Sequence, residues 1–163
     1  PITNRDPEFP AMQVLNTLFG GGMTCKLFQN IREKRSLCYD IGSGYYGSKG
    51  ILTVSAGIDF DKKELVREQV LAQLREIVRG NVTGQELTAA RESLLSSLQT
   101  THDTPGAIEG YYANGALSGM KWTPEEYMQK LHHFVGVRTE GVKQLSNQYM
   151  IRQCFDEAAK YYK

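Results

Sequence analysis

Hydrophobic residues recur at helical spacing near the start of the chain. Residues 10–19 predict a helix, and Pro10 suits its first turn, where a backbone amide has no helical partner. The apolar face of this helix consists of Val14, Leu15, Leu18 and Phe19. The glycines at 20–22 end the helix, and Thr24 is suited to cap a second helix that runs to about Lys34.

The hydrophobic period changes to two from Leu37 onward. Alternate side chains over residues 37–46, and again over 51–58, are expected to point to opposite faces, as in β-strands. Turn-forming residues at 47–50 lie between them, so the two strands are expected to form an antiparallel hairpin. One face of the first strand is formed by Leu37, Tyr39, Ile41, Ser43 and Tyr45, and the core face of the second by Leu52, Val54, Ala56 and Ile58.

The region after the hairpin is predicted to be helical. Pairs that resemble capping boxes, Asp61 with Glu64 and Thr83 with Glu86, start two long amphipathic helices. Further helices are expected from Pro105, from Thr123 and over residues 138–149. A hairpin flanked by helices predicts an α+β fold, with helices packed on one face of an antiparallel sheet. Because two strands alone rarely make a stable sheet, we expect the sheet to be incomplete in this chain.

Length and composition are those of one folded domain. The chain has 163 residues, of which we assign 1–150 to an α+β domain and leave the tail 151–163 unassigned. Its 19 basic and 18 acidic residues are interspersed, which speaks against nucleic-acid binding. No apolar run approaches the ~18 residues of a membrane span. The cysteines Cys25, Cys38 and Cys154 have no paired spacing, so we expect a reducing, cytoplasmic setting.

The histidines do not form a zinc motif. A zinc hydrolase needs two histidines one helical turn apart with a glutamate between them, whereas the chain offers His102, His132 and His133. The adjacent pair would diverge by about 100° around a helix. Neither H-E-x-x-H nor H-x-x-E-H occurs. We therefore expect this chain to hold no metal ion and no catalytic residue of its own.

Arg32 and Tyr39 are the candidate peptide-binding residues, at the end of the second helix and the start of the first strand. An arginine offers five donors to carbonyl or carboxylate groups, and a tyrosine hydroxyl can donate to an oxyanion. A purely structural explanation also stays open. In it, Arg32 pairs with Glu33 or Asp40 at the surface, and Tyr39 is a half-buried strand aromatic.

Two stretches resemble a segment of the M16 zinc peptidases, the family of insulinase and the mitochondrial processing peptidase. Residues 18–22 read LFGGG, and residues 26–39 read KLFQNIREKRSLCY. The resemblance extends more loosely over residues 7–149 and is to the C-terminal half of these enzymes. It implies a clam-shell of two related α+β halves, of which the N-terminal half binds zinc through H-x-x-E-H and a distal glutamate.

By this resemblance, Arg32 and Tyr39 would bind the substrate peptide opposite the zinc ion. The implied function is the C-terminal substrate-binding domain of an M16-type zinc endopeptidase, whose zinc is supplied by the absent N-terminal half. The chain is also similar to bacterial homologues that lack the zinc motif, so the alternative is a non-catalytic partner subunit that serves binding or assembly. Either function implies a homo- or heterodimer with an N-terminal half or a homologous subunit. A helix-rich interaction domain unrelated to the family is a third possibility.

Overall fold

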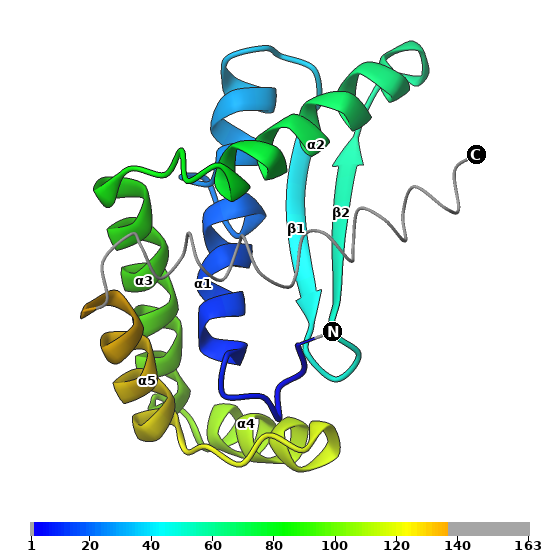
Figure 1. Ribbon diagram of the computed structural model, residues 1–163. Coiled ribbons are helices and arrows are strands. Elements are labelled where there is room, and N and C mark those ends of the chain that lie inside the picture. Colours follow the sequence, from blue (N-terminus) through cyan, green and yellow to red (C-terminus); the bar gives the residue numbers. More distant parts are fainter. Residues whose placement is uncertain (1, 137–163) are drawn as a thin grey trace.

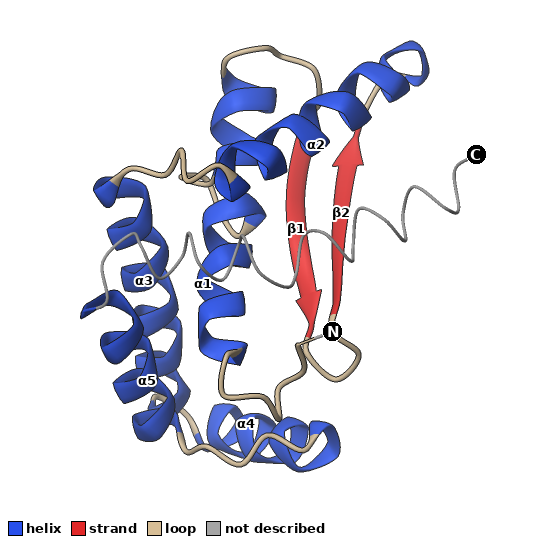
Figure 2. Cartoon of the chain, viewed as in Figure 1, coloured by secondary structure: helices blue, strands red, loops and turns tan. Residues whose placement is uncertain are grey.

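The computed structural model describes residues 2–136 and has the α+β architecture expected from the sequence (Figure 1 and Figure 2). The elements are, in order, α1 (Phe9–Gly20), a π-helix (Phe28–Glu33), β1 (Asp40–Tyr46), β2 (Ile51–Gly57), α2 (Lys63–Val78), α3 (Gly84–Gln99), α4 (Pro105–Ser118) and α5 (Pro124–Gly136). Short 3₁₀ turns at Phe60–Lys62 and Thr100–His102 precede α2 and α4. The helix predicted over 138–149 and the domain boundary at 150 lie outside the described residues.

The hairpin forms as predicted, but its first strand starts later. β1 and β2 are antiparallel and pair from Asp40 with Gly57 to Tyr46 with Ile51. The predicted start at Leu37 is wrong because the chain there still closes the preceding helix. The amide of Leu37 donates to a carbonyl of the π-helix at 3.2 Å. This helix end therefore adjoins the start of β1.

Helix α1 is the centre of the core and packs against both β1 and α3 (Figure 1). Its last residue sets how closely the strand approaches, because a Cβ on Gly20 would lie 2.4 Å from Oγ of Ser43. The Ser43 hydroxyl donates to Oδ1 of Asn16 at 2.8 Å, which holds the strand to the helix. The predicted apolar face of α1 is buried, as expected. Other buried side chains include Leu27, Ile31, Ile77, Leu95 and Leu131.

The helix starts show which capping predictions are right. Thr83 and Glu86 form a reciprocal capping box at the start of α3, as predicted. The box predicted to begin at Asp61 is wrong, because a 3₁₀ turn occupies this position and no described side chain caps α2. The cap predicted at Thr24 is also wrong, since Sγ of Cys25, rather than the Thr24 hydroxyl, accepts the hydrogen bond from the backbone amide of Phe28. The predicted starts of α4 and α5 are confirmed.

Val54, a predicted core position, and Leu65, an apolar residue of α2, lie at the surface. Val54 is 37% exposed, because α1 packs against β1 and leaves β2 as the outer strand of the described sheet. Leu65 is 44% exposed, because it lies about 100° around α2 from the buried Val66. Despite such exposed apolar side chains, the described helices include none with the length and apolar composition needed to cross a membrane.

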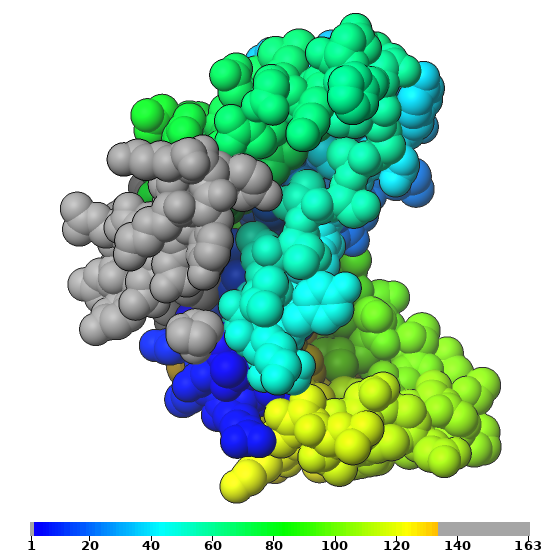
Figure 3. Space-filling view, turned by 90° about the vertical axis from the view of Figure 1, so that its right-hand side faces the viewer, coloured from blue at the N-terminus to red at the C-terminus, as the bar shows by residue number. Residues whose placement is uncertain are grey.

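The hairpin runs between α2 at one end and α4 at the other (Figure 1). The space-filling view in Figure 3 shows α2 above the hairpin and α4 below it, with the surface hollowed between the hairpin and α4. Pockets lie at both ends of the hairpin. One adjoins the start of β1, and the other adjoins the turn between the strands.

Candidate functional site

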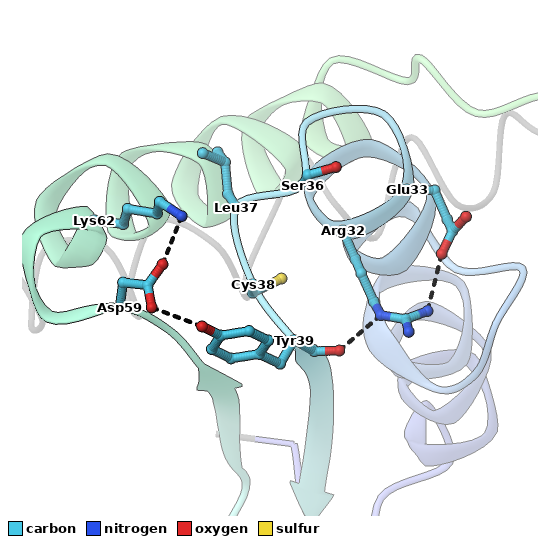
Figure 4. A pocket seen from close by; sticks show the side chains of 8 residues that line it. All are labelled: Arg32, Glu33, Ser36, Leu37, Cys38, Tyr39, Asp59 and Lys62. Carbon is cyan, nitrogen blue, oxygen red and sulfur yellow. Dashed lines mark hydrogen bonds and ion pairs between the residues drawn. The ribbon is translucent and has the colours of Figure 1, made fainter.

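The first pocket lies where β1 begins and β2 ends, beside the π-helix (Figure 4). It has a volume of about 410 Å³. We call it the charged pocket. Its lining consists of Arg32, Glu33, Ser36, Leu37, Cys38, Tyr39, Asp59 and Lys62. Four of these eight side chains belong to basic or acidic residues, so the pocket presents both signs of charge within a small space.

Arg32 projects from the π-helix and is held in place by three neighbours. Its Nε donates to the backbone carbonyl of Tyr39 at 2.7 Å, and its Nη1 donates to Oε1 of Glu33 at 2.9 Å. The guanidinium carbon also lies 4.6 Å from the centre of the Phe28 ring, within the range of a cation–π contact. Within residues 2–136, Nη2 has no recorded hydrogen bond. The arginine is therefore fixed in orientation while one terminal nitrogen remains available to a ligand.

Tyr39 follows the π-helix and stands just before β1. Its side chain is 70% exposed, and its hydroxyl donates to Oδ1 of Asp59 at 2.8 Å. The other oxygen of Asp59 accepts a bond from Nζ of Lys62 at 2.6 Å. These contacts form a chain of three polar side chains along one side of the pocket (Figure 4).

The hydrogen bonds among Tyr39, Asp59 and Lys62 set the protonation states of these three side chains. The pKa of Tyr39 is raised by the hydrogen bond to Asp59 and by the negative charge of that carboxylate. The pKa of Asp59 is lowered by its hydrogen bonds with Lys62 and Tyr39, and the pKa of Lys62 is raised by the same carboxylate. At neutral pH the pocket therefore holds a neutral phenol, a carboxylate and an ammonium group.

The structure brings Arg32 and Tyr39 into one pocket, but by a contact that the sequence does not reveal. Arg32 bonds the backbone carbonyl of Tyr39, and the phenol is directed away from the guanidinium toward Asp59 (Figure 4). The expected surface pairing of Arg32 with Glu33 is present. The expectation that Tyr39 is half-buried is wrong, because the residue is 70% exposed.

Asp59 and Lys62 are the site residues that sequence reasoning missed. Asp59 follows directly after β2, and Lys62 lies three residues further on, in a 3₁₀ turn. An acidic and a basic residue at this spacing favour an ion pair, and that signal was available in the sequence. The capping role assigned to Asp61, two positions away, obscured it.

Cys38 also lines the pocket, as a protonated thiol. Burial and the neighbouring Asp40 raise its pKa, although Arg32 acts in the opposite direction. A thiol with a raised pKa is a poor nucleophile, because the thiolate is the reactive form. Cys25 is buried and also free. Neither cysteine has the setting of a catalytic residue.

The described side chains do not fit a zinc ion. No group of three histidine, cysteine or carboxylate side chains within residues 2–136 is placed to hold a metal. Nε2 of His102 lies 2.8 Å from Oε1 of Glu125, so this histidine has a carboxylate partner on α5. His132 and His133 are exposed on α5. If the protein uses zinc, its ligands must come from outside this part of the chain.

Comparison with known proteins identifies relatives of this fold. The family model described as "Peptidase M16 inactive domain" matches residues 1–94. The chain is 29% identical over 132 residues to the "Probable inactive metalloprotease YmfF" of Bacillus subtilis, covering 81% of this chain and 31% of that protein. It is 34% identical over 120 residues to an "Uncharacterized zinc protease" of Rickettsia bellii, covering 72% of this chain and 29% of that protein. The chain thus spans less than a third of the length of these relatives.

Solved structures have the same fold. A conserved protein from Enterococcus faecalis V583 superposes with a TM-score of 0.77 at 28% identity, covering 89% of this chain and 34% of the other. The peptidase M16 inactive domain from Pseudomonas fluorescens superposes with a TM-score of 0.77 at 24% identity, covering 91% of this chain and 36% of the other. The sequence matches and the shared fold lead to one conclusion: this chain belongs to the M16 peptidase family and carries its inactive domain.

Proposed function

We propose that this chain is the substrate-binding C-terminal domain of an M16-type zinc endopeptidase. In this proposal the charged pocket binds a peptide, and the zinc belongs to an N-terminal half or a homologous subunit that pairs with this chain. The observation that carries the proposal is that Arg32 and Tyr39 line one open pocket, with the arginine already fixed in orientation.

Arg32 is suited to hold a peptide because its position is set before a ligand arrives. Two hydrogen bonds and the Phe28 ring restrict the side chain, so little rotamer freedom remains to be lost on binding. Its Nη2 could donate to a peptide carbonyl or to a terminal carboxylate. Its side chain is 39% exposed, which makes it reachable from solvent.

Tyr39 would bind by exchanging one partner for another. Its hydroxyl now donates to Asp59, and in the complex it would donate to a substrate carbonyl instead. This exchange would leave a carboxylate oxygen without the phenol, but Lys62 still neutralises that carboxylate. Asp59 and Lys62 would thus act as positioning residues that hold the phenol near the ligand until it is needed.

A non-catalytic partner subunit is the second candidate function. The similarity to a B. subtilis protein named as a probable inactive metalloprotease favours it. In that case the charged pocket would hold a peptide or a partner segment without cleavage. The two candidates differ in whether the intact protein carries zinc and hydrolyses peptides. In either case the free thiols Cys25 and Cys38 support a reducing, cytoplasmic setting.

The test is peptide binding by the intact protein that contains this chain, with a fluorescein-labelled ten-residue peptide of mixed composition as the probe. We expect Arg32→Ala to weaken binding roughly 10- to 100-fold, because it removes a hydrogen bond donated by a charged group, and Tyr39→Phe to weaken it roughly 2- to 10-fold, because it removes a hydrogen bond between neutral groups. Matched controls are Arg35→Ala, which removes a nearby cation outside the pocket lining, and Tyr112→Phe, which removes the hydroxyl of another exposed tyrosine.

The controls should bind like the unaltered protein, and all four variants should melt within a few degrees of it. Unchanged binding by both pocket variants would refute the proposal. A loss of binding that follows a matching loss of thermal stability would show that Arg32 and Tyr39 are structural. If the intact protein also releases cleaved peptide and contains one zinc ion, the endopeptidase is the correct alternative.

A further inference from the structure

Tyr39 combines a fixed backbone with a side chain that is free to turn. Its backbone amide donates to the carbonyl of Gly57 at 2.8 Å, and its backbone carbonyl accepts from Nε of Arg32 at 2.7 Å. The residue is nevertheless 70% exposed, and among the described residues its hydroxyl is held by Asp59 alone. A rotation about the side-chain bonds can therefore redirect the hydroxyl while the backbone stays in place.

Asp59, the acceptor of this hydroxyl, is fixed by Lys62. Its backbone carbonyl accepts from the amide of Lys62 at 3.0 Å, and its Oδ2 accepts from Nζ of the same lysine at 2.6 Å. Oδ1 is left for the Tyr39 hydroxyl, 2.8 Å away (Figure 4). The side chains of Lys62 and Asp59 are 36% and 42% exposed, so the pair can be reached from the pocket. The carboxylate therefore stays in position whether or not the phenol is bonded to it.

The Tyr39 hydroxyl has only one proton to donate, and the carboxylate of Asp59 accepts it. Hydrogen bonds to an ionised acceptor are roughly twice as strong as those between neutral groups, so a peptide carbonyl is the weaker acceptor of the two. Arg32 differs, because a guanidinium has five donors and its Nη2 has no hydrogen bond within residues 2–136. A peptide can thus bond Arg32 without displacing anything, but it must displace Asp59 from Tyr39.

We propose that Asp59 and a bound peptide compete for the single proton of the Tyr39 hydroxyl, so that the bond from Tyr39 to Asp59 is an autoinhibitory contact of the charged pocket. This inference rests on the proposed function, because it concerns the peptide bound there. It adds that Asp59 lowers the affinity of the site it lines. The contact keeps the phenol in one orientation at the cost of weaker binding of neutral acceptors.

Lys62 limits the strength of this contact. An ammonium group 2.6 Å from Oδ2 neutralises the carboxylate and makes it a weaker acceptor, and the pKa of Asp59 is lowered by this lysine. Without Lys62 the carboxylate would hold the phenol more firmly. Asp59 and Lys62 therefore have opposite effects on peptide affinity, although they are bonded to each other. Two residues that merely supported the pocket would have effects of the same sign.

The test is calorimetric titration of the intact protein that contains this chain, with EDTA present to prevent cleavage. The probe is the blocked peptide N-acetyl-Ala-Ser-Leu-Gly-Phe-Ala-amide, which is uncharged and so does not respond directly to a change of charge in the pocket. We expect Asp59→Asn to tighten binding roughly 2- to 10-fold, because an amide oxygen accepts the phenol proton less strongly than a carboxylate does. We expect Lys62→Met to weaken binding roughly 2- to 5-fold, because the carboxylate then keeps its full charge.

Both effects must pass through the phenol. In the Tyr39→Phe background there is no proton to compete for, so Asp59→Asn and Lys62→Met should each leave the affinity unchanged within about 1.5-fold. This double-mutant comparison separates competition for the hydroxyl from any general influence of the two residues on the pocket.

The matched controls are Asp61→Asn and Lys63→Met. They remove a carboxylate and an ammonium group close by in the sequence, and neither residue lines the charged pocket. Both controls should bind like the unaltered protein. Trp122 is the only tryptophan of the 163-residue chain, and its ring lies 6.4 Å from that of Phe9, which lines the pocket at the other end of the hairpin. Its fluorescence emission within the isolated chain should be the same in all variants, which checks that the fold is unchanged.

The possible failures are distinguishable. Weaker binding by Asp59→Asn, or equal tightening in the presence and absence of the Tyr39 hydroxyl, would overturn this inference. If Tyr39→Phe alone still weakens binding, the proposed function stands in either case. If neither Arg32→Ala nor Tyr39→Phe weakens binding, the inference and the proposed function are both refuted.

Discussion

The two ends of the hairpin hold pockets of opposite character. In the charged pocket, the polar side chains are largely exposed and already paired with one another, as in the sequence of contacts from Tyr39 through Asp59 to Lys62. In the second pocket, at the hairpin turn, every described lining residue is uncharged, and we call this pocket the uncharged recess. The same two strands thus connect a site lined by charged side chains to a site whose described lining carries no charge.

The two pockets would gain binding energy in different ways. A ligand of the charged pocket can accept a bond from the free Nη2 of Arg32, but at Tyr39 it must replace the existing bond to Asp59, so its net gain there is small. A ligand of the recess would instead gain by covering apolar surface. We therefore expect the charged pocket to contribute selectivity and the recess to contribute affinity. Variants at the two ends of the hairpin test this difference.

The largest effect is expected from Phe9→Ala, beneath the recess. Phe9 is 5% exposed, and its ring lies 6.1 Å from that of Tyr127 and 6.2 Å from that of Tyr45. Truncation of a buried phenylalanine to alanine costs about 3–5 kcal/mol, and we expect a loss of this size in urea denaturation. The control is Phe60→Ala near the charged pocket, which should change stability by less than about 0.5 kcal/mol because Phe60 is 93% exposed. Similar losses of unfolding free energy in Phe9→Ala and Phe60→Ala would contradict the difference in packing between the two ends of the hairpin.

An intermediate effect is expected from Lys26→Met, in the helical segment that leads to Arg32. Nζ of Lys26 is 2.7 Å from Oε1 of Glu86, and this pair ties the helical segment that leads to Arg32 to the start of α3. The lysine side chain is 9% exposed and that of the glutamate 29%. Because the remaining carboxylate is only partly hydrated, we expect a loss of about 1–3 kcal/mol in urea denaturation. Adding Glu86→Gln to Lys26→Met should recover part of this loss, since the amide keeps the cap without the charge.

The same pair predicts a pH dependence of stability. Burial alone would raise the pKa of Glu86, but hydrogen bonds from Lys26 and Thr83 outweigh it, so the pKa is lowered from its ordinary value of about 4.5. A carboxyl group with a lowered pKa stabilises the fold above the pKa of the unfolded chain, and this contribution is lost as the pH falls through the folded-state pKa. Stability should therefore decline below about pH 4.5. In Lys26→Met the part of this decline due to Glu86 should be smaller, and an identical acid profile would show that the pair does not set this pKa.

The smallest effect is expected from Asp59→Asn, which should change the ionisation of one phenol. The Asp59 carboxylate raises the pKa of Tyr39 above its ordinary value of about 10, so the variant should bring it back toward that value. The midpoint can be followed by NMR of ¹³C-labelled tyrosine rings, with Tyr39→Phe to assign the signal. Asp61→Asn is the matched control, because this nearby carboxylate does not contact the phenol. The fluorescence of Trp122 should be unaffected, and a change there would show that the two ends of the hairpin are coupled.

Local features of this fold were predictable from the sequence, and contacts between distant segments were not. The hairpin and the box of Thr83 with Glu86 were found because each depends on residues a few positions apart. The proximity of Arg32 to the start of β1 was predictable for the same reason. The direction of the Tyr39 phenol was not, because it depends on where the chain returns after β2 to place Asp59.

The uncharged recess could not be predicted from sequence patterns. It joins Asn4 with Tyr46 and Leu117, which come from three separate parts of the chain, and no periodicity connects such positions. Asn4 reads in the sequence as an ordinary polar residue of a loop. Its burial and the lack of a partner for its Oδ1 appear only in the folded structure.

The contact of Gly20 with Ser43 has a mechanical consequence. Ser43 is the middle residue of β1, so the strand rests on α1 at its midpoint, where even a methyl group would not fit. This contact leaves β1 little room to slide along α1. A tilt of the strand about Gly20 would move the two ends of the hairpin in opposite directions, so we expect any coupled motion of the two ends to be a rotation about this glycine rather than a translation.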